Sequence, residues 1–348
     1  MEGKMKAAVM TDIMKSAYIE KEIPKVKNDE VLIKVEYVGV CGSDLHYYET
    51  GAIGPYVVEP PFILGHECSG TIVEMGTDVT HLSVGDRVAL EPGKTCGKCS
   101  YCIRGDYHLC AEVEFFATPP FDGTLCEYVA HEAKLCFKLP ENVSTLEGCL
   151  IEPLAVGFHA ANQGKAEFGQ SAVVYGAGCI GLVSMMALKS KGVKNIIVVD
   201  IMAKRLEKAL ELGATQIIDA SKVDPVEQIK LLTQGKGVDL AIETAGTTVT
   251  TNQCIHSTAK GATVVLVGYS STGKMDLEMS LALDKELTFE TVFRYKHIYP
   301  MAIEAVSKNN LMLEKLVTDI FDFDDVPNAL EKSIRDKRDI VKSVIRVG

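Results

Sequence analysis

The sequence lacks several features that define other classes of protein. It contains no run of about 18 consecutive apolar residues, so neither a membrane-spanning helix nor a membrane partner is predicted. It has no excess of basic residues either, since 36 Lys and Arg stand against 47 Asp and Glu and the formal net charge is −11. Without a basic stripe to neutralise phosphates, nucleic acid is not an expected partner. Internal repeats and low-complexity linkers are also absent.

The N-terminal segment MEGKMKAAVM lacks the long apolar core of a secretory signal. We therefore expect a cytoplasmic protein in a reducing environment. In that setting the eleven cysteines of the chain are expected to be metal ligands and small buried side chains, because disulfides are rare in the cytosol.

The length of 348 residues exceeds what one hydrophobic core usually holds, so two domains are expected. The N-terminal part is predicted to be rich in short strands bounded by Gly, Pro or Asp. The candidate strands are Val31–Val38, Ser69–Glu74, Arg87–Leu90 and Leu125–Val129. The turn-rich run Gly51–Pro61 is predicted to be a surface loop.

From about Phe168 onward, short apolar runs alternate with segments long enough for a helix. The predicted strands are Ser171–Tyr175, Asn195–Val199, Gln216–Ile218, Val238–Glu243, Thr263–Val267 and Leu287–Val292. This alternation predicts an α/β fold with a doubly wound parallel sheet. A helical stretch, Tyr299–Lys308, and the strand-like runs Leu316–Phe321 and Val341–Val347 are predicted to return and complete the first domain.

A glycine-rich turn follows the first strand of this α/β region. The motif G-x-G-x-x-G and the start of its helix comprise Gly176, Gly178, Cys179, Ile180 and Gly181. The glycines permit a tight turn and close approach to a pyrophosphate, and the helix N-terminus offers free N–H groups. Such a turn alone is also compatible with a purely structural role, but Asp200 ends the next strand, where a carboxylate binds the ribose hydroxyls of NAD and disfavours NADP. Arg205, one helical turn further on, would weaken this preference if it reached the ribose.

Four cysteines lie close together with the spacing C-x2-C-x2-C-x7-C. They are Cys96, Cys99, Cys102 and Cys110. This density predicts a closed, tetrahedral structural zinc site. An iron–sulfur cluster uses the same ligands, but the last spacing is longer than in the common ferredoxin motif. Four unrelated buried cysteines are the remaining alternative.

A second possible metal site is dispersed along the chain. Cys41 occurs in GVCGSDLHYY, His66 and Glu67 in LGHE, and Glu152 in LIEPL. One thiolate, one imidazole and a carboxylate leave a fourth position open, as in catalytic zinc sites, where the metal makes a bound alcohol more acidic. Each residue alone is equally compatible with a structural role, and spacing does not prove that they converge.

Together these segments resemble the zinc-dependent medium-chain dehydrogenases over essentially the whole chain. The matching segments are GVCGSDLHYY, LGHECSG, SVGDRVALEPG, the four-cysteine lobe, LIEPL, GAGCIG and Asp200. Within that family, FFATPPFDG, IEPLAVGFHA and VFRY are similar to sorbitol and xylitol dehydrogenases. The four-cysteine lobe departs from the best-known animal sorbitol dehydrogenases, while many microbial polyol dehydrogenases keep it.

The resemblance implies a β-rich, GroES-like catalytic domain at residues 1–154 and 295–348, with a Rossmann domain inserted at 155–294. It assigns the catalytic zinc to Cys41, His66 and Glu67, with Glu152 as a ligand or as an outer carboxylate reached through water. It places the Ser43 hydroxyl beside the alcohol oxygen, with His46 passing the proton outward, although His46 is otherwise compatible with an ordinary surface histidine. The positions that line the polyol pocket are Tyr47, Phe115, Thr118, Arg294 and Tyr295.

The implied reaction oxidises a secondary alcohol of a polyol to a ketose and transfers hydride to NAD, with one catalytic and one structural zinc. Threonine, butanediol and sugar-alcohol phosphates are alternative substrates within the family. A non-catalytic NAD-binding protein is the alternative from another class. The resemblance also implies a homotetramer or homodimer, for which the edge strand Leu287–Val292 is a candidate pairing surface.

Overall fold

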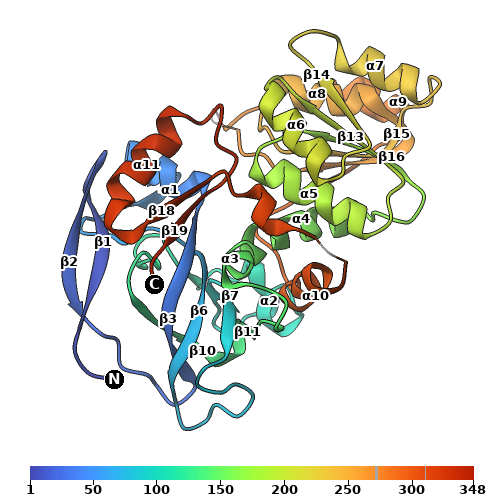
Figure 1. Cartoon of the computed structure of the whole chain (residues 1–348). Helices are drawn as coiled ribbons and strands as arrows, with labels where there is room; N and C mark the ends of the chain where they lie inside the picture. Colours follow the sequence, from blue (N-terminus) through green and yellow to red (C-terminus); the bar gives the residue numbers. More distant parts are fainter. Residues whose placement is uncertain (271–272, 310) are drawn as a thin grey trace. The chain divides into compact units, whose positions relative to one another are not determined.

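The computed structural model describes residues 1–270, 273–309 and 311–348 (Figure 1). Its contacts divide the chain into two compact units. Unit 1 contains Met1–Glu152, Tyr299–Lys308 and Leu313–Gly348, and unit 2 contains Pro153–Ile298 and Asn309–Met312. In the described part of the chain, no helix has the length and apolar character needed to cross a membrane.

Unit 1 is built on a largely antiparallel sheet in which, among the described residues, the strands run in the order β11-β7-β6-β3-β19-β18 and β10 also pairs with β3. Their bounds are β3 (Glu30–Val40), β6 (Glu67–Met75), β7 (Arg87–Leu90), β10 (Tyr128–Glu132), β11 (Cys136–Lys138), β18 (Asp319–Asp322) and β19 (Ser343–Arg346). Strands β18 and β19 pair in parallel, whereas β19 meets β3 in antiparallel orientation. The C-terminal segment thereby completes the sheet begun by the N-terminal one, as the sequence predicts.

Shorter elements surround this sheet. The strands are β1 (Lys4–Asp12), β2 (Lys15–Glu22), β4 (Ala52–Ile53), β5 (Tyr56–Val57), β8 (Gly93–Lys94) and β9 (Glu114–Phe115). The α-helices are α1 (Gly42–Thr50), α2 (Ser100–Ile103), α3 (Thr145–Cys149), α10 (Tyr299–Asn309) and α11 (Val326–Arg335), while α4 (Ile151–Gln163) begins at the end of unit 1. Single 3-10 turns are η1 (Tyr107–Leu109), η2 (Ala133–Leu135), η3 (Leu313–Leu316) and η4 (Phe323–Asp325). Helix α11 buries Val326, Ala329, Leu330 and Ser333, the spacing of one helical face.

Unit 2 confirms the predicted doubly wound fold. Within the described residues its parallel sheet has the order β14-β13-β12-β15-β16-β17. The strands are β12 (Ser171–Tyr175), β13 (Asn195–Asp200), β14 (Gln216–Asp219), β15 (Val238–Glu243), β16 (Thr258–Leu266) and β17 (Thr288–Thr291). The helices between them are α5 (Cys179–Ser190), α6 (Ala203–Leu212), α7 (Pro225–Leu232), α8 (Thr248–Ser257) and α9 (Met279–Asp284). Helix α5 packs against α6, and α8 packs against α7 and α9 (Figure 1).

The strand order of unit 2 reverses between β12 and β15. Both strands are near-continuous apolar runs, and four of the five residues of β12 are buried, because helices cover both faces of such a sheet. In open α/β sheets, ligands bind beyond the carboxyl ends of the strands at this reversal. A ligand of unit 2 is therefore expected at the turns that follow Tyr175 and Glu243.

Two strand predictions in unit 1 are displaced from the observed elements. The sequence predicts a strand at Leu125–Val129, but β10 spans Tyr128–Glu132. Leu125 instead bonds through its backbone to Ala8 and Leu64, outside the β10 register. The run Leu316–Phe321 also begins late, because η3 ends at Leu316 and β18 starts only at Asp319.

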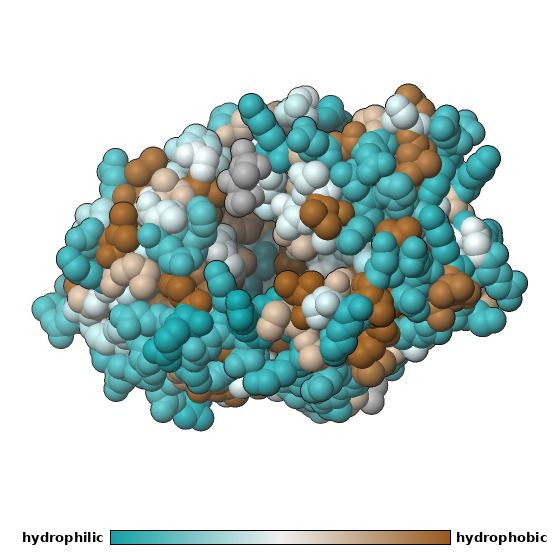
Figure 2. Space-filling view, turned by 90° about the horizontal axis from the view of Figure 1, so that it is seen from above, coloured by the Kyte–Doolittle hydropathy of each residue, from teal (hydrophilic) through white to brown (hydrophobic). Residues whose placement is uncertain are grey.

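The surface is mainly hydrophilic, and Figure 2 shows teal residues over most of the visible face with brown ones among them. Several large apolar side chains are exposed, for example Phe168, Ile103, Leu283 and Leu231. Individually exposed apolar residues are normal for a folded protein. They do not by themselves identify a binding surface.

Candidate active site

Three candidate metal ligands meet in unit 1. Strands β3 and β6 are antiparallel and pair Gly39 with Glu67. Cys41 follows β3 directly and His66 precedes β6, so the register brings both beside Glu67. One ligand atom from each of Cys41, His66 and Glu67 lies within 4.8 Å of the others, while Glu152 is not part of this group. A thiolate, an imidazole and a carboxylate at this separation fit a zinc ion with an open fourth position.

A buried aspartate holds this group in place. Asp44 accepts backbone N–H groups of Cys41 and Gly65, both at 2.9 Å, and its Oδ1 lies 3.6 Å from Nδ1 of His66. Burial by itself would lower the pKa of His66, but Asp44 and Cys41 raise it well above the usual value. The carboxylate of Asp44 therefore favours a proton on Nδ1 of His66. With Nδ1 facing Asp44, Nε2 remains as the metal-binding atom, which is the usual arrangement of zinc-ligating histidines.

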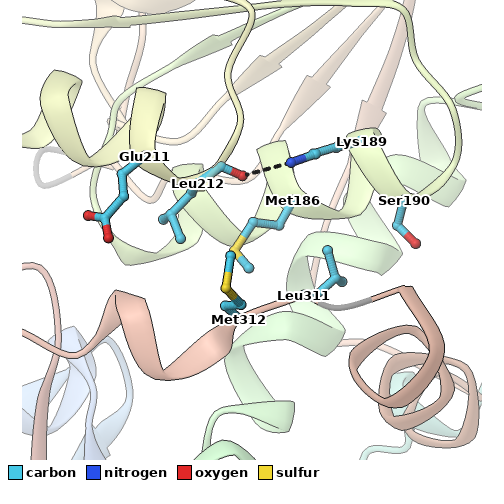
Figure 3. A pocket seen from close by; sticks show the side chains of 7 residues that line it. All are labelled: Met186, Lys189, Ser190, Glu211, Leu212, Leu311 and Met312. Carbon is cyan, nitrogen blue, oxygen red and sulfur yellow. Dashed lines mark hydrogen bonds between the residues drawn. The ribbon is translucent and has the colours of Figure 1, made fainter.

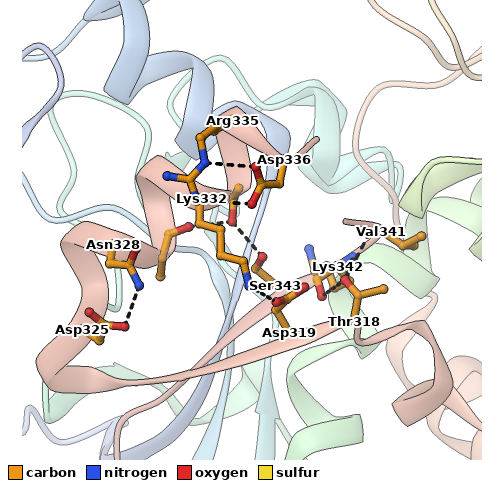
Figure 4. A network of polar contacts seen from close by, with 12 residues as sticks. Thr318, Asp319, Asp325, Asn328, Lys332, Arg335, Asp336, Val341, Lys342 and Ser343 are labelled. Carbon is orange, nitrogen blue, oxygen red and sulfur yellow. Dashed lines mark hydrogen bonds and ion pairs between the residues drawn. The ribbon is translucent and has the colours of Figure 1, made fainter. Parts of the chain in front are cut away.

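A buried lysine, Lys342, which directly precedes the C-terminal strand β19, also reaches the group. Nζ of Lys342 lies 2.5 Å from the Glu67 carboxylate and donates to Val40 O at 2.9 Å. Thr318 Oγ1 donates to Lys342 O at 3.1 Å (Figure 4). The Ser333 and Ser343 hydroxyls lie 2.7 Å apart. Lys342 is thus held through its own carbonyl oxygen and through the neighbouring Ser343, the first residue of β19.

Glu152 lies in the first turn of α4 and is buried. Its charge is close enough to affect Glu91, whose pKa is raised to about 7 by burial and, to a lesser extent, by Glu152. The Tyr107 hydroxyl donates to Glu91 Oε1 at 2.7 Å. Tyr107 belongs to the four-cysteine lobe, so this contact ties the lobe to the sheet.

The four cysteines of the lobe converge. The Sγ–Sγ distances are 3.5 Å for Cys99–Cys102, 3.6 Å for Cys96–Cys110 and 3.9 Å for Cys96–Cys102. Four sulfurs about 2.3 Å from one tetrahedral zinc are about 3.8 Å apart, so the spacing fits the metal. Backbone N–H groups of Lys98 and Cys99 lower the pKa of Cys96 to about 7, which favours the thiolate that zinc requires.

In unit 2 the glycine-rich turn lies between β12 and α5. Gly178 is the N-cap of α5, so the first N–H groups of the helix face the turn. A Cβ on Gly181 would overlap the carbonyl oxygen of Gly176, which explains why the third glycine is needed. Cys179 and Ile180, the first two residues of α5, are partly exposed.

Asp200 ends β13 beside this turn. Its Oδ2 accepts the N–H of Ala177 at 2.6 Å and its Oδ1 accepts that of Met202 at 2.8 Å. Arg205 approaches the turn too, with Nη1 3.8 Å from the position of a Cβ on Gly178. The acidic residue and the arginine named from the sequence therefore both flank the glycine-rich turn.

A pocket of about 240 Å³ lies elsewhere in unit 2. It is lined by Met186, Lys189, Ser190, Glu211, Leu212, Leu311 and Met312 (Figure 3). Lys189 donates to Leu212 O at 3.4 Å within it. These α5 residues lie at the end of the helix opposite the glycine-rich turn, so this pocket is separate from the dinucleotide turn.

Comparison with known proteins decides the family. Residues 27–141 match the alcohol dehydrogenase GroES-like domain, and residues 179–308 match the zinc-binding dehydrogenase domain. A sorbitol dehydrogenase of Bacillus subtilis is 41% identical over 98% of this chain and 97% of its own length. The chain belongs to the zinc-dependent medium-chain dehydrogenases.

Solved structures of family members agree with this assignment. An oxidoreductase/dehydrogenase of unknown specificity from Escherichia coli has a TM-score of 0.95 and 42% identity, covering 99% of this chain and 100% of that chain. An Escherichia coli CFT073 protein described as a short chain alcohol dehydrogenase, complexed with NADH, has a TM-score of 0.90 and 31% identity, with 99% of each chain covered. As a family member, the protein is an oxidoreductase with zinc and NAD as its cofactors.

The residues predicted to line a family substrate pocket are distributed over both units. Tyr47 is buried on α1, and Phe115 on β9 packs against His66 with ring centroids 5.7 Å apart. Thr118 is partly exposed in the turn after β9. In unit 2, Arg294 stacks its guanidinium over Phe293 at 4.7 Å, and the neighbouring Tyr295 is buried.

Sequence reasoning missed two residues that shape this family site. Asp44 lies inside GVCGSDLHYY, three residues after Cys41, and its signal was an acidic residue next to a metal ligand. Lys342 is a charged residue within the strand-like run Val341–Val347. Its burial at 3% exposure follows from pairing with Glu67, which no local pattern indicates.

Proposed function

We propose that this enzyme oxidises a secondary alcohol of a polyol of the sorbitol or xylitol type to a ketose, with hydride transfer to NAD. The observation that supports a catalytic site most directly is the convergence of Cys41, His66 and Glu67 within 4.8 Å, next to helix α1, whose second residue is Ser43. The 41% identity to a sorbitol dehydrogenase over nearly the whole chain supports the polyol class.

In this proposal Cys41, His66 and Glu67 hold the catalytic zinc, and Glu152 is a further ligand or an outer carboxylate reached through water. Cys96, Cys99, Cys102 and Cys110 hold the structural zinc. When bound, zinc supplies a Lewis acid that makes the substrate hydroxyl more acidic, and NAD supplies the hydride acceptor. The turn of Gly176–Gly181, with Asp200 and Arg205, binds the dinucleotide.

Ser43 and His46 provide a route for the hydroxyl proton. They are three residues apart on α1 (Gly42–Thr50) and therefore lie on the same helical face. Ser43 is half-buried directly after the metal-site loop, whereas His46 is exposed. The Ser43 hydroxyl accepts the proton of the substrate hydroxyl as it gives its own proton to the His46 imidazole, and His46 then releases a proton to solvent.

The selectivity for polyols is assigned to a set of aromatic and polar side chains. They are Tyr47, Phe115, Thr118, Arg294 and Tyr295. Arg294 and Tyr295 supply hydrogen bonds to the additional hydroxyl groups of a sugar alcohol. A site built for such hydroxyls rejects simple aliphatic alcohols, because its polar groups would be left unpaired.

The test is NADH formation with sorbitol, xylitol, galactitol, threonine, 2,3-butanediol and polyol phosphates, before and after chelation. We expect turnover of a free polyol that is lost on chelation and restored by zinc. Ser43→Ala should lower kcat by roughly 100-fold or more, and His46→Gln by less, in line with losses of acid–base groups. His256→Gln is the control, because His256 lies on α8 in unit 2 and pairs with Glu278, the N-cap of α9.

Preference for threonine, butanediol or a phosphate would replace the polyol assignment while leaving the zinc and NAD chemistry in place. Failure of every substrate, despite bound zinc and NAD, would favour a non-catalytic protein or an untested alcohol. Unchanged kcat in Ser43→Ala would remove the proposed proton route.

A cytoplasmic homodimer or homotetramer completes this proposal. Strand β17 (Thr288–Thr291) is an edge of the described parallel sheet, and both of its end residues are exposed. An exposed edge is suited to pairing with a second copy. Sedimentation equilibrium would test it: a monomer at micromolar concentration would contradict this part of the proposal.

A further inference from the structure

A buried carboxylate organises the turn after β15. Glu243 is fully buried at the end of the strand, and its Oε1 accepts the N–H of Ala245 at 2.8 Å and that of Gly246 at 2.9 Å. The same oxygen accepts the Thr250 hydroxyl of α8 at 2.7 Å. Burial raises the pKa of Glu243, and these donors act in the opposite direction. One carboxylate therefore binds two consecutive backbone N–H groups of the turn and one hydroxyl group of α8.

The turn held by Glu243 is packed against the turn after β16. The carbonyl of Glu243 accepts N–H groups of Val267 at 2.9 Å and Gly268 at 3.1 Å. A Cβ on Gly246, which has a φ of +67°, would overlap Tyr269 O, and a Cβ on Gly268 would overlap Gly246 N. The two turns are in backbone contact, so a displacement of one displaces the other.

The next residue connects this arrangement to the glycine-rich turn. Thr244 donates its N–H to Tyr175 O at 2.9 Å, and its Oγ1 donates to the same oxygen at 2.9 Å. Its Oγ1 also lies 2.6 Å from the position of a Cβ on Gly176 and 2.9 Å from one on Gly181. The turns after β12, β15 and β16 thus form one connected rim at the carboxyl ends of the strands.

Each turn of this rim belongs to one of the two halves of the sheet, and each half of such a sheet binds one half of a dinucleotide. Dinucleotide-binding sheets consist of two mononucleotide-binding halves that meet where the strand order reverses. The glycine-rich turn and Asp200 belong to the half formed by β12, β13 and β14. The turns organised by Glu243 belong to the other half, formed by β15, β16 and β17.

We propose that Glu243 is a positioning residue for the nicotinamide half of NAD, acting through the turns that follow β15 and β16. This inference rests on the proposed function, in which the turn Gly176–Gly181 binds the pyrophosphate. Glu243 itself does not touch the cofactor. Its side chain holds the backbone of Ala245 and Gly246, and its carbonyl oxygen holds that of Gly268, in the turns where this proposal places the second nucleotide.

The experiment compares a ligand that needs both halves with one that needs a single half. NADH and AMP are titrated separately into the full-length zinc-loaded protein, and the KM for NAD is measured with the preferred alcohol. Glu243→Gln retains the size of the side chain but presents an amide NH2 beside the donor N–H of Gly246. Thr250→Val removes only the hydroxyl donor and keeps the carboxylate.

Asp239→Asn is the matched control. Asp239 lies on β15 near its other end, and its carboxylate also accepts a backbone N–H and a hydroxyl, both from Ser171, at 2.9 and 2.8 Å. Its loss perturbs the same strand without reaching the turns at the carboxyl end. Thermal midpoints of all variants are recorded so that general destabilisation is measured independently.

We expect Glu243→Gln to weaken NADH binding and raise the KM for NAD about 10-fold, as expected for hydrogen bonds lost at a buried acceptor. AMP binding should change less than about 2-fold. Thr250→Val should give a smaller effect in the same direction, and Asp239→Asn should leave the ratio of NADH to AMP affinity unchanged.

Equal weakening of AMP and NADH, or unchanged NADH binding in Glu243→Gln, would overturn this inference alone. A shifted ratio in Asp239→Asn would overturn it too, because the effect would then follow from the strand rather than from the turns. Absence of NADH binding by the unsubstituted protein would overturn the proposed function and this inference together.

Discussion

Lys342, the residue directly before the last strand of the chain, forms a buried ion pair with Glu67, a candidate zinc ligand. Their charged groups lie 2.5 Å apart, and the side chains are 3% and 1% exposed. A buried carboxylate without a partner is costly, so the lysine neutralises Glu67 when no metal is present. Lys342 also donates to the carbonyl of Val40, the residue before Cys41, so this one side chain contacts two parts of the site.

Lys342→Met should strongly destabilise the metal-free protein. Removing one partner of a buried pair leaves an uncompensated charge, and we expect a loss of about 3–5 kcal/mol in the free energy of unfolding. Zinc should recover more stability in this variant than in the unsubstituted protein, since the metal then compensates Glu67. Urea unfolding with and without zinc measures both quantities.

Lys332→Met is the control for this experiment. Lys332 pairs with Asp319 at 2.5 Å in the same C-terminal segment, but both side chains are partly exposed. Its loss should cost no more than about 1 kcal/mol. A loss in Lys342→Met no greater than that of the control would contradict the importance of the buried pair.

Asp44→Asn should weaken zinc binding at the catalytic site. Asp44 orients His66 and holds the N–H groups of Cys41 and Gly65. Outer partners of zinc ligands typically affect metal affinity by about 10–100-fold, and we expect a loss in this range in competition titrations with a chelating dye. Asp122→Asn is the control, because Asp122 accepts the N–H of Ile63 at 3.0 Å, two residues before the Gly65 N–H that Asp44 accepts. Equal losses in both variants would assign the effect to the loop rather than to His66.

Cys102→Ser should remove the structural zinc and leave the catalytic one. Its sulfur lies 3.5 Å from that of Cys99 and 3.9 Å from that of Cys96, so one tetrahedral ligand is lost. Atomic emission should report one zinc per chain instead of two, with a lowered thermal midpoint. Cys126→Ser is the control: Cys126 lies outside the four-cysteine group, and burial raises the pKa of its thiol to about 12. Two zinc ions retained in Cys102→Ser would contradict the assignment.

Much of the fold was accessible from the sequence, because its signals are local. The strands Ser171–Tyr175 and Val238–Glu243 were predicted with their observed bounds, since each is a short apolar run closed by turn residues. Leu125–Val129 was displaced because Leu125 is buried in a segment whose backbone bonds to Ala8 and Leu64, and the regular ladder begins only at Tyr128. Periodicity does not distinguish these two ways of burying a short segment.

The candidate sites were accessible to different degrees. The four cysteines and the glycine-rich turn each occupy a short stretch, so spacing alone carries their geometry. Cys41 and His66 are brought together only by the register of β3 and β6. Lys342 depends on β19 pairing with β3 from the far end of the chain, and Glu243 depends on contacts between two turns. Such long-range pairings leave no periodic trace in one sequence.

Glu91 should make the stability of the protein fall as pH rises from about 4.5 to about 7. It is buried, and its pKa is raised from 4.5 to about 7, first by burial and then by Glu152. Between these two values the folded protein binds a proton that the unfolded chain has already lost, so the free energy of unfolding decreases as pH increases. At about 1.4 kcal/mol per pKa unit, the free energy of unfolding above pH 7 is about 3 kcal/mol lower than it would be with Glu91 protonated in both states.

Glu91→Gln should abolish this contribution while keeping an oxygen that accepts the Tyr107 hydroxyl. The variant should equal the unsubstituted protein near pH 4.5 and exceed it in stability at pH 8. Urea unfolding at pH 4.5, 6, 7 and 8 measures the difference between the two proteins, in which the other titrating groups cancel. A difference that does not grow with pH would show that Glu91 is ionised throughout, and its burial would then have to be compensated by a group other than Tyr107.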